Sequence, residues 1–461
     1  MDRRRARADD DDERVDQGKK AKVEETPLEF YLTALRGVTK AQNQYSRSLA
    51  SLLDGDFTHA ILTNYKVDVP WLFAQCARLA RVPVLLVHGS HPSSIQDACK
   101  AYTNVTPIAP PLPIPYGTHH TKMMILFHPT FVRVAIFTAN FVAGDWNYKT
   151  QGLWTQDFPA VIATAIRPCA FHSDLLDYMT ALGPPVARLC TEKFPRYDFT
   201  SAKVSLVASV PGVYHGKAAM EKYGHLRMKR CVLPNLFEVQ YRPKNPTTHP
   251  LVCQYSSLGS LDEKWLVEFY ASMTGQGTSS VASPIPTGKL HLVWPSVADV
   301  VRLHLSQNSN EGWDAGRSLP CALKNLKPFL HKYLRAWHPP PVLHRQNAMP
   351  HIKSYAPVDP TTQSLDYVLL TSANLSKAAW GALQKSNTQF MIRSYELGVL
   401  LLPDATTSLS FVDASDTLTT VRRCPLPFQW PPTPYNTRVD EPWTWDLPRT
   451  APDGFGRTYE P

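Results

Sequence analysis

Two histidine–lysine pairs are the residues in this sequence whose types and spacing best suggest chemistry. The segment YGTHHTKMMILF, residues 116–127, places His120 and Lys122 at the start of an apolar run. The segment HIKSYAPV repeats the spacing with His351 and Lys353. Residues two apart on a β-strand point to the same face, so each pair should present both side chains together.

The same features follow both pairs in the same order. After the first, HPT permits a chain reversal, and VRVAIFTAN predicts a second strand ending at Asn140, with Gln151 next in KTQGLW. After the second, DYVLLTSAN predicts a strand ending at Asn374, with Glu396 next in SYELGVLLLP. We interpret the two units as an internal duplication with polar groups at matching strand ends.

The H-x-K spacing alone carries little information. His215 and Lys217 in YHGKAAM also have it, but Asn235 in LPNLF does not end an apolar T-A-N strand, so we interpret this match as a coincidence. His119 would point to the opposite face of its strand from His120, so we assign it a structural role.

Two histidines, two lysines and two asparagines converging on one point would fit a phosphodiester. Lysine and asparagine would bind the non-bridging oxygens and stabilise the charge of the transition state. One neutral imidazole would attack phosphorus and form a phosphohistidine, while the other would protonate the leaving oxygen and then activate water. The two environments should therefore separate the pKa values of the two histidines.

Gln151 and Glu396 are the expected orienting groups. Each could accept a hydrogen bond from the far ring N–H of a histidine, and the charged one would raise the basicity of its partner. The sequence does not say which pairs with which. We expect no cofactor and no metal, because the lysines supply the electrostatic stabilisation and no carboxylate cluster of the two-metal type appears.

Composition limits the class of protein. The chain has 461 residues and a net charge of +9, which favours a polyanionic partner but also fits an ordinary solvated surface. The eight cysteines form no CxxC pair, so we expect reduced thiols of an intracellular protein. No apolar run reaches the roughly 18 residues of a membrane span, and the N-terminus is too charged for a signal peptide.

The chain divides into three parts. Residues 1–26 are almost entirely polar and are predicted to be disordered; their RRRAR and GKKAK clusters fit nuclear-import signals or non-specific basic arms, although a solvated tail is the simpler interpretation. Strands alternate with helices from HAILTNYK onward, and the pattern restarts after about residue 200, which predicts α/β domains over 27–201 and 202–461. The Pro- and Trp-rich segment near the C-terminus should be irregular but ordered.

The paired H-x-K…N motifs resemble those of the phospholipase D superfamily. Most members carry an aspartate five residues after the lysine, where this chain has Phe127 and Val358. That difference argues against ordinary phospholipases and cardiolipin synthases. From about residue 28 to the C-terminus, the chain instead resembles the tyrosyl-DNA phosphodiesterase family. The segments that carry the resemblance are GTHHTKMM, DWNYKTQGLW, AMPHIK, TSANLSKAAWGAL, IRSYELGVLLLP, SSLGSLDEKWL and PWTWDLP.

That resemblance implies two similar α/β/α sandwich domains with one active site at their interface, in a metal-independent monomer. It implies hydrolysis of the bond between a DNA 3′-phosphate and tyrosine, left by a stalled type IB topoisomerase. The implied partners are DNA with a 3′-phosphotyrosyl end, single-stranded, nicked or blunt, and a topoisomerase-derived peptide, without a membrane. We expect a nuclear enzyme, with the cytoplasm as a second location.

Residue roles carried over from the resemblance are specific. His120 would be the nucleophile and His351 the general acid/base. The phosphate would be held by Lys122, Lys353, Asn140 and Asn374, with Gln151 and Glu396 orienting. The DNA contacts would be Tyr116, Ser257, Ser260, Ser376 and Trp445. Two alternatives remain at this point: a phospholipase D-type enzyme acting on lipid phosphates, and a DNA-end-binding protein without catalytic activity.

Overall fold

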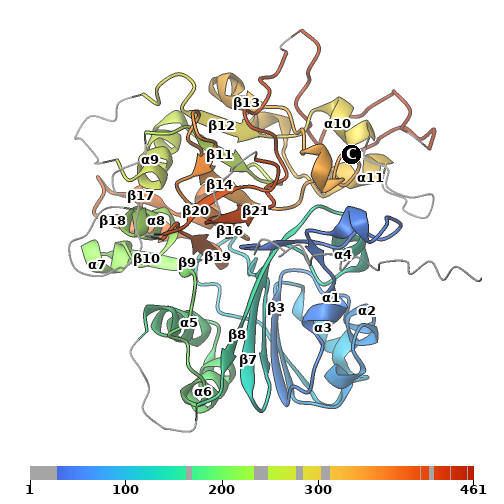
Figure 1. Cartoon of the computed structure of the whole chain (residues 1–461), viewed down its shortest axis with the longest axis vertical. Helices are drawn as coiled ribbons and strands as arrows, with labels where there is room; N and C mark the ends of the chain where they lie inside the picture. The colour runs from blue at the N-terminus through green and yellow to red at the C-terminus, as the bar shows by residue number, and fades with distance from the viewer. Residues whose placement is uncertain are drawn as a thin grey trace, which may run out of the picture.

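Two large β-sheets organise the chain (Figure 1). The computed structural model describes residues 28–161, 169–232, 248–276, 284–302, 312–404, 406–414, 420–436, 438–453 and 455–461. The tail predicted to be disordered, residues 1–26, lies outside these ranges. Strands β7 and β8 of the first sheet contact β16 and β19 of the second, so the sheets meet at their ends.

The first sheet has eight strands in the order β2-β1-β8-β7-β6-β3-β4-β5. Their bounds are β1 Tyr31–Thr33, β2 Ser46–Arg47, β3 His59–Asn64, β4 Val84–His88, β5 Val105–Ile108, β6 Met123–Phe127, β7 Phe131–Phe137 and β8 Gly152–Pro159. The strand–helix–strand unit expected from HAILTNYK onward is confirmed as β3, α2 and β4. Helix α2 begins after Asp68, whose carboxylate caps it by accepting from the Trp71 N–H.

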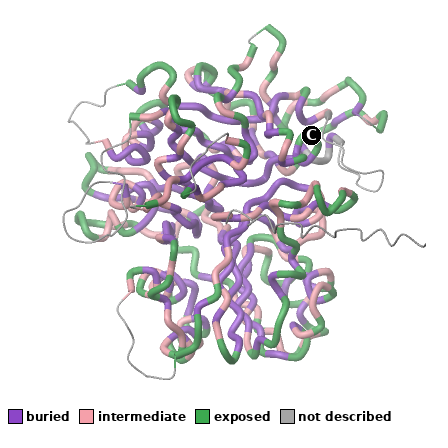
Figure 2. The backbone as a smooth tube through the Cα atoms, viewed as in Figure 1, coloured by how far each residue is buried: buried purple, intermediate pink, exposed green. Residues whose placement is uncertain are grey.

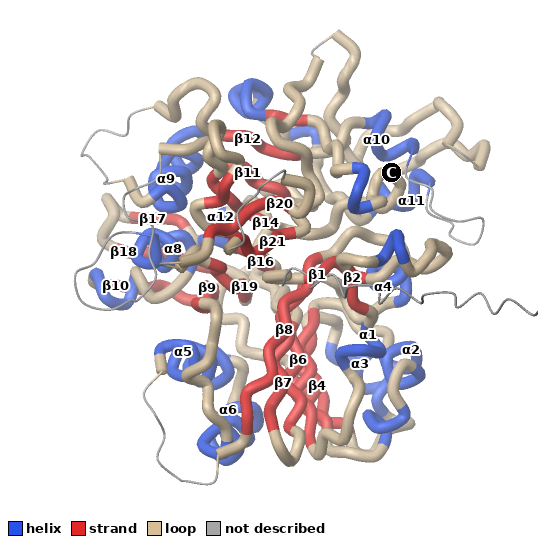
Figure 3. The backbone as a smooth tube through the Cα atoms, in the orientation of Figure 1, coloured by secondary structure: helices blue, strands red, loops and turns tan. Residues whose placement is uncertain are grey.

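Helices cover both faces of this sheet (Figures 1 and 3). On one side lie α1 Leu49–Leu52, α2 Val69–Ala74 and α3 Pro92–Cys99, and on the other lie α5 Ala170–Ala181 and α6 Pro184–Lys193. Along β6, Met124 and Leu126 pack in the core with α1 to α3, whereas Met123, Ile125 and Phe127 pack in the core that includes α5 and α6. The alternation explains why the strand reads as a continuous apolar run.

The second sheet has seven strands in the order β13-β12-β11-β14-β16-β19-β9. Their bounds are β9 Ser205–Ser209, β11 Leu251–Gln254, β12 Leu290–Val293, β13 Leu334–Arg335, β14 Ser354–Pro357, β16 Val368–Thr371 and β19 Glu396–Leu401. Two three-stranded sheets accompany it: β10 Gly212–His215, β17 Ala382–Gln384 and β18 Gln389–Ile392, and β15 Ser364–Leu365, β20 Ser408–Phe411 and β21 Val421–Cys424.

The remaining helices are short. They are α4 Ala143–Asn147, α7 Lys217–Met220, α8 Gly224–Val232, α9 Glu263–Thr274, α10 Val297–Arg302, α11 Gly312–Arg317 and α12 Lys377–Trp380. The part of the chain that the structure describes also has six 3₁₀ segments: η1 Ala41–Asn43, η2 Ala77–Ala80, η3 Phe194–Arg196, η4 Leu323–Asn325, η5 Pro328–Tyr333 and η6 Pro341–Leu343. Helices α8 and α9 pack against β9 and β11.

The duplication extends well beyond the motifs. Strands β1, β8, β7, β6, β3, β4 and β5 correspond in order to β9, β19, β16, β14, β11, β12 and β13. The directions also match, since four antiparallel pairings precede two parallel ones in both sheets. Figure 2 shows buried residues along the strands of both sheets. The expected α/β fold with an internal duplication is therefore confirmed.

The described C-terminal segment has little regular structure, as expected, and its tryptophans differ. Trp443 is fully buried and stacks on Trp313, whereas Trp445 is 42% exposed. All eight cysteines are free thiols, five of them buried. Within the described residues, every helix is too short or too polar to cross a bilayer.

Candidate active site

The topology brings the polar groups of each sheet to one end. His120 lies just before β6, and Gln151 immediately precedes β8. Asn140 lies just after β7, which runs antiparallel to both. In the second sheet His351 precedes β14, Asn374 follows β16, and Glu396 begins β19. Since neighbouring antiparallel strands start and stop at the same edge, three groups gather at each sheet end. The two ends face each other across one cavity.

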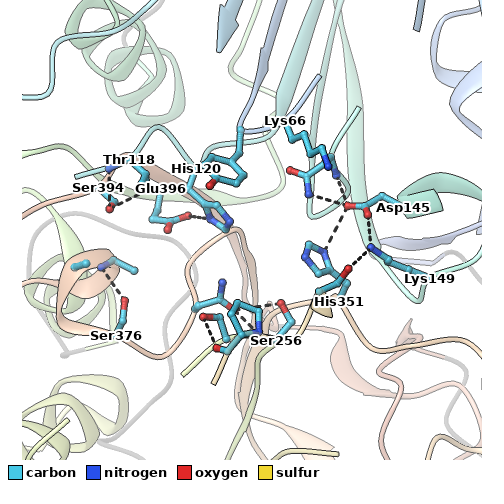
Figure 4. Close-up of a pocket in the computed structure, with 18 of the residues that line it drawn as sticks. Lys66, Thr118, His120, Asp145, Lys149, Ser256, His351, Ser376, Ser394 and Glu396 are labelled. Carbon is cyan, nitrogen blue, oxygen red and sulfur yellow. Dashed lines mark hydrogen bonds and ion pairs between the residues drawn. The ribbon is translucent and has the colours of Figure 1, made fainter. Parts of the chain in front are cut away.

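That cavity has a volume of about 480 Å³ and combines residues from both halves (Figure 4). Of the predicted site residues, those that line it are His120, His351, Asn140, Asn374, Glu396, Tyr116, Ser257 and Ser376. Lys122, Lys353 and Gln151 are fully buried behind the histidines. Ser260 and Trp445 are exposed and are not among the lining residues.

Two backbone crossings join the halves beside the histidines. His119 forms a β-bridge with Tyr395, and the His120 N–H donates to the Tyr395 carbonyl at 3.0 Å. Thr150 forms the equivalent bridge with Pro350, and the His351 N–H donates to the Thr150 carbonyl at 2.9 Å. Each histidine is therefore held next to the orienting group of the opposite half.

His120 pairs with Glu396. Its Nδ1 lies 3.0 Å from Oε2 of the carboxylate, which also accepts from the Ser372 hydroxyl at 2.5 Å. The Ser372 hydroxyl in turn accepts from the Leu397 N–H at 3.0 Å. With Nδ1–H donating to the carboxylate, Nε2 is left as the unprotonated nitrogen available to the cavity.

His351 pairs with Gln151. The amide oxygen accepts from His351 Nδ1–H at 3.0 Å, and the amide nitrogen donates to the Thr138 hydroxyl at 2.7 Å. The Thr138 hydroxyl accepts from the Gly152 N–H at 3.0 Å, as Ser372 does in the other half. The pairing left open by the sequence is thus crossed: each orienting side chain comes from the opposite sheet.

The lysines occupy equivalent positions behind the two rings. Lys122 Nζ donates to the His120 carbonyl at 2.7 Å, and Lys353 Nζ donates to the His351 carbonyl at 2.5 Å. Burial lowers the pKa of Lys122 to about 8, against the opposing attraction of Glu396 and Asp145. Burial and the charge of Lys122 lower the pKa of Lys353 well below its ordinary value. Clustered buried cations of this kind favour an anionic ligand.

Both histidines have lowered pKa values in this environment. For His120 burial is the main cause, and Glu396 partly opposes it. For His351 burial and Lys353 lower the pKa well below its ordinary value, and Asp145 opposes them. The environments were expected to separate the two pKa values. Both pKa values are lowered, and they differ only in how far they are lowered. The more depressed group is His351, the expected acid, so both imidazoles are neutral at neutral pH.

The two asparagines differ in how they are held. Asn374 Oδ1 accepts from the Ser256 N–H at 3.0 Å, which leaves its Nδ2 donor for a ligand. Asn140 Nδ2 instead donates to Asp145 Oδ2 at 2.9 Å, and the same carboxylate oxygen accepts from the Asn140 N–H at 2.7 Å. Only Asn374 is therefore fixed purely as a donor toward the cavity.

Sequence reasoning missed several residues of the site. Thr138 and Ser372 stand two positions before the asparagines in the T-A-N and S-A-N segments, where a repeated hydroxyl was visible. Asp145 and Lys149 both line the cavity and form an ion pair at 2.7 Å. Their i, i+4 spacing between two predicted site residues was the available signal.

The residues given no catalytic role lie elsewhere. His119 is fully buried on the other face of its segment, with its ring 5.7 Å from that of Tyr395. His215 ends β10 and Lys217 begins α7, and neither is among the residues that line the cavity. Both outcomes agree with the expectations from the sequence.

Comparison with known proteins gives one consistent result. A family model described as tyrosyl-DNA phosphodiesterase matches residues 29–436. The chain is 37% identical to tyrosyl-DNA phosphodiesterase 1 of Arabidopsis thaliana, covering 95% of this chain and 77% of the relative. It is 31% identical to the Drosophila melanogaster protein of that name, covering 91% and 74%. The crystal structure of the yeast tyrosyl-DNA phosphodiesterase superposes with a TM-score of 0.64 at 17% identity, covering 90% and 99%.

Proposed function

This chain belongs to the tyrosyl-DNA phosphodiesterase family, and on that premise we propose that its cavity hydrolyses a DNA 3′-phosphotyrosyl bond through a phosphohistidine. The enzyme is a phosphodiesterase of DNA repair. The observation that carries the mechanism is the pair of imidazoles facing one cavity, each oriented through Nδ1 by the opposite half.

In the first step, neutral His120 attacks phosphorus through Nε2 as the bond from phosphorus to the tyrosine oxygen breaks. Protonated His351 gives its proton to that oxygen, so tyrosine leaves as the neutral phenol. Lys122, Lys353 and Asn374 stabilise the charge on the non-bridging oxygens. Binding of the anionic phosphate raises the pKa of His351 from its depressed value and so supplies the protonated acid.

In the second step, the now neutral His351 removes a proton from water. The hydroxide attacks phosphorus, and the bond to His120 Nε2 breaks with its electron pair returning to the ring. The products are a DNA 3′-phosphate and the starting form of the nucleophile. His351 holds the transferred proton and is ready for the next cycle, so the proton balance closes.

The DNA-binding proposal uses one wall of the cavity. Ser257 and Ser376 line it, and Ser257 Oγ donates to the carbonyl of Pro320. Trp445 lies beside this wall, because its backbone N–H donates to the carbonyl of Cys321, the residue after Pro320, at 3.1 Å. Tyr116 at the rim is 94% exposed, as a ring that stacks on a base would be. Such hydroxyl and aromatic contacts suit single-stranded DNA without strong sequence preference.

The test compares one preparation on a 3′-phosphotyrosyl oligonucleotide and on phosphatidylcholine, with a chelator present. We expect tyrosine release from the oligonucleotide and none after His120→Ala, because the group that forms the adduct is then missing. Lipid turnover without DNA cleavage would instead support the phospholipase alternative. Tight binding of DNA ends without tyrosine release would support an inactive end-binding protein.

His351→Asn separates the two histidine roles. Loss of the acid/base should slow both steps, the second more, because water then has no base. A covalent protein–DNA adduct should accumulate and appear as a mass increase in intact-protein mass spectrometry. If His351→Asn shows slow turnover with no adduct, the division of roles is wrong.

We further propose that the enzyme acts as a monomer in the nucleus, with a topoisomerase-derived peptide as the leaving group. A single chain supplies both histidines and both orienting groups, which supports the first point. Light scattering on the purified protein and imaging of a fluorescent fusion test the oligomeric state and the location.

A further inference from the structure

The two related halves place their carboxylates differently around the histidines. At Nδ1, His120 has the charged Glu396, whereas His351 has the neutral Gln151. In the segments that follow the asparagines, it is the half that supplies the neutral Gln151 that carries a carboxylate. The first half carries Asp145 on α4, five residues after Asn140, while the equivalent position on α12 is Ala379. A carboxylate is therefore supplied to each imidazole, but from a different site.

Asp145 is held in one geometry by three donors. Its Oδ2 accepts from the Asn140 N–H at 2.7 Å and from Asn140 Nδ2 at 2.9 Å, and its Oδ1 accepts from Lys149 Nζ at 2.7 Å. The side chain is almost fully buried. Burial alone would raise the pKa of Asp145, but the charge and hydrogen bond of Lys149 and the hydrogen bond from the Asn140 N–H outweigh it and keep the carboxylate ionised.

The same carboxylate lies beside the proposed general acid. Its Oδ2 is 3.8 Å from His351 Nδ1, as Figure 4 shows with a dashed line. The other charged groups closest to His351 are Lys353 behind it, Lys149 after α4 and Lys122 from the β6 side, and all three are positive. Across the cavity the Glu396 carboxylate is already paired with His120. Asp145 is thus the negative group best placed to stabilise an imidazolium at His351.

We propose that Asp145 is a positioning residue that stabilises protonated His351 by its charge, while Gln151 only orients the ring. Lys149 keeps Asp145 ionised and fixed, and Asn140 completes its hydrogen bonds. This inference rests on the proposed function, because it assigns a charge partner to the general acid of that reaction. It predicts that Asp145 acts on the step in which the tyrosine oxygen is protonated.

The first test is the pH profile of single-turnover tyrosine release by Asp145→Asn, which keeps the shape and one of the two acceptor oxygens but loses the charge. The carboxylate lies 3.8 Å from His351 Nδ1. At effective dielectric constants between those of protein and water, removing its unit charge should lower the pKa of His351 by about one to three pH units. The descending alkaline limb should move to lower pH by that amount. Asp145→Glu should restore part of the shift, because it keeps the charge.

A matched control is Asp157→Asn. Asp157 is a carboxylate of the same half that pairs with Arg133 on the surface, away from the cavity lining. Its removal should leave the pH profile unchanged. A uniform fall in rate for Asp145→Asn at every pH, with no movement of the limb, would overturn the proposal in favour of a purely structural role.

The second test changes the leaving group. In a 3′-(4-nitrophenyl) phosphate ester the leaving group is 4-nitrophenolate, which is a much weaker base than the tyrosine phenolate and needs little protonation. Asp145→Asn should therefore lose far less activity on this ester. Equal losses on both esters would overturn the proposal. Asp145→Asn leaves the buried Lys149 without its ion-pair partner. The double variant Asp145→Asn/Lys149→Met removes both charges of the pair, and it should show the same selective loss of activity on the tyrosyl ester.

Failure of this inference is distinguishable from failure of the proposed function. If the unsubstituted enzyme releases tyrosine and Asp145→Asn behaves like Asp157→Asn, only the role of Asp145 is wrong. If the unsubstituted enzyme does not release tyrosine at all, the proposed function itself fails.

Discussion

At the scale of single residues, the site is a set of buried bases whose protonated forms would repel one another in the absence of a ligand. Lys122 and Lys353 are fully buried, and each lowers the pKa of groups around it. His120 and His351 stand in front of them with lowered pKa values. An anion entering the cavity would reverse these shifts, so the binding of phosphate and the protonation of the site should be linked.

Inorganic phosphate should therefore bind with uptake of protons between pH 7 and 8. The measurement is isothermal titration calorimetry in buffers of different ionisation enthalpy, where the slope of the heat against that enthalpy gives the proton number. Lys353→Met should take up fewer protons than the unsubstituted enzyme. A slope of zero would show that the site is already fully protonated and would contradict the linkage.

Lys122 also makes a prediction about stability. Its pKa falls from 10.5 in the unfolded chain to about 8 in the fold, which corresponds to a cost on the order of 3 kcal/mol below pH 8. The unfolded state binds more protons between pH 8 and 10.5, so this cost disappears as the pH rises through that window. Lys122→Met should be more stable than the unsubstituted protein at pH 7 and lose most of that advantage by pH 10, as measured by urea unfolding.

The opposite pH trend, with the advantage of Lys122→Met growing toward pH 10, would contradict the lowered pKa. The same variant should lose about 10²–10³ in kcat, the usual effect of removing one group that stabilises a transition state. Greater stability with lower activity is the expected combination for a buried charge retained for function.

At the scale of elements, the site depends on two backbone crossings between sheet ends. The segment before His120 passes so close to the second half that a Cβ at Gly117 would lie 2.1 Å from the carbonyl oxygen of Arg393. The Arg393 guanidinium also donates to the Pro115 carbonyl at 2.7 Å. A backbone atom cannot yield as a side chain does, so this approach requires glycine.

Gly117→Ala should push the first crossing apart and misplace His120 relative to Glu396. We expect a loss of about 1–3 kcal/mol in stability from overpacking and at least about a tenfold loss of activity from misalignment. Thermal unfolding and tyrosine release measure the two effects. Gly288→Ala is the control: its positive φ of 74° makes alanine costly, but its missing Cβ has open space, so only stability should fall.

At the scale of the whole molecule, the net charge of +9 and the open cavity suggest that long-range attraction brings DNA to the site. Because such attraction releases counterions, KM for a long 3′-phosphotyrosyl oligonucleotide should rise steeply between 50 and 200 mM salt. KM for a 3′-phosphotyrosyl mononucleotide should rise much less, and kcat should change little for either. Equal salt dependence for the two substrates would show that DNA beyond the scissile phosphate is not bound.

Much of the fold and of the chemistry could be predicted from local patterns. Period-two spacing places His120 with Lys122 and His351 with Lys353, and apolar runs ending in Asn140 and Asn374 mark the strand ends. These patterns involve neighbours along one strand, so they survive whatever the strand packs against. The repeated order of motifs then predicts a duplicated α/β fold, and the sheets confirm it over seven strands each.

The partners of each histidine could not be predicted, because they depend on which sheet ends meet. Glu396 reaches His120 across 276 residues of sequence, and Gln151 reaches His351 across 200. The approach of Asp145 to His351 follows from the same packing. Sequence by itself predicted the two histidines, their lysines and the reaction that these groups suit. Only the tertiary structure decided which charge stands beside which imidazole, because that is set by contacts between the halves and not by spacing along a strand.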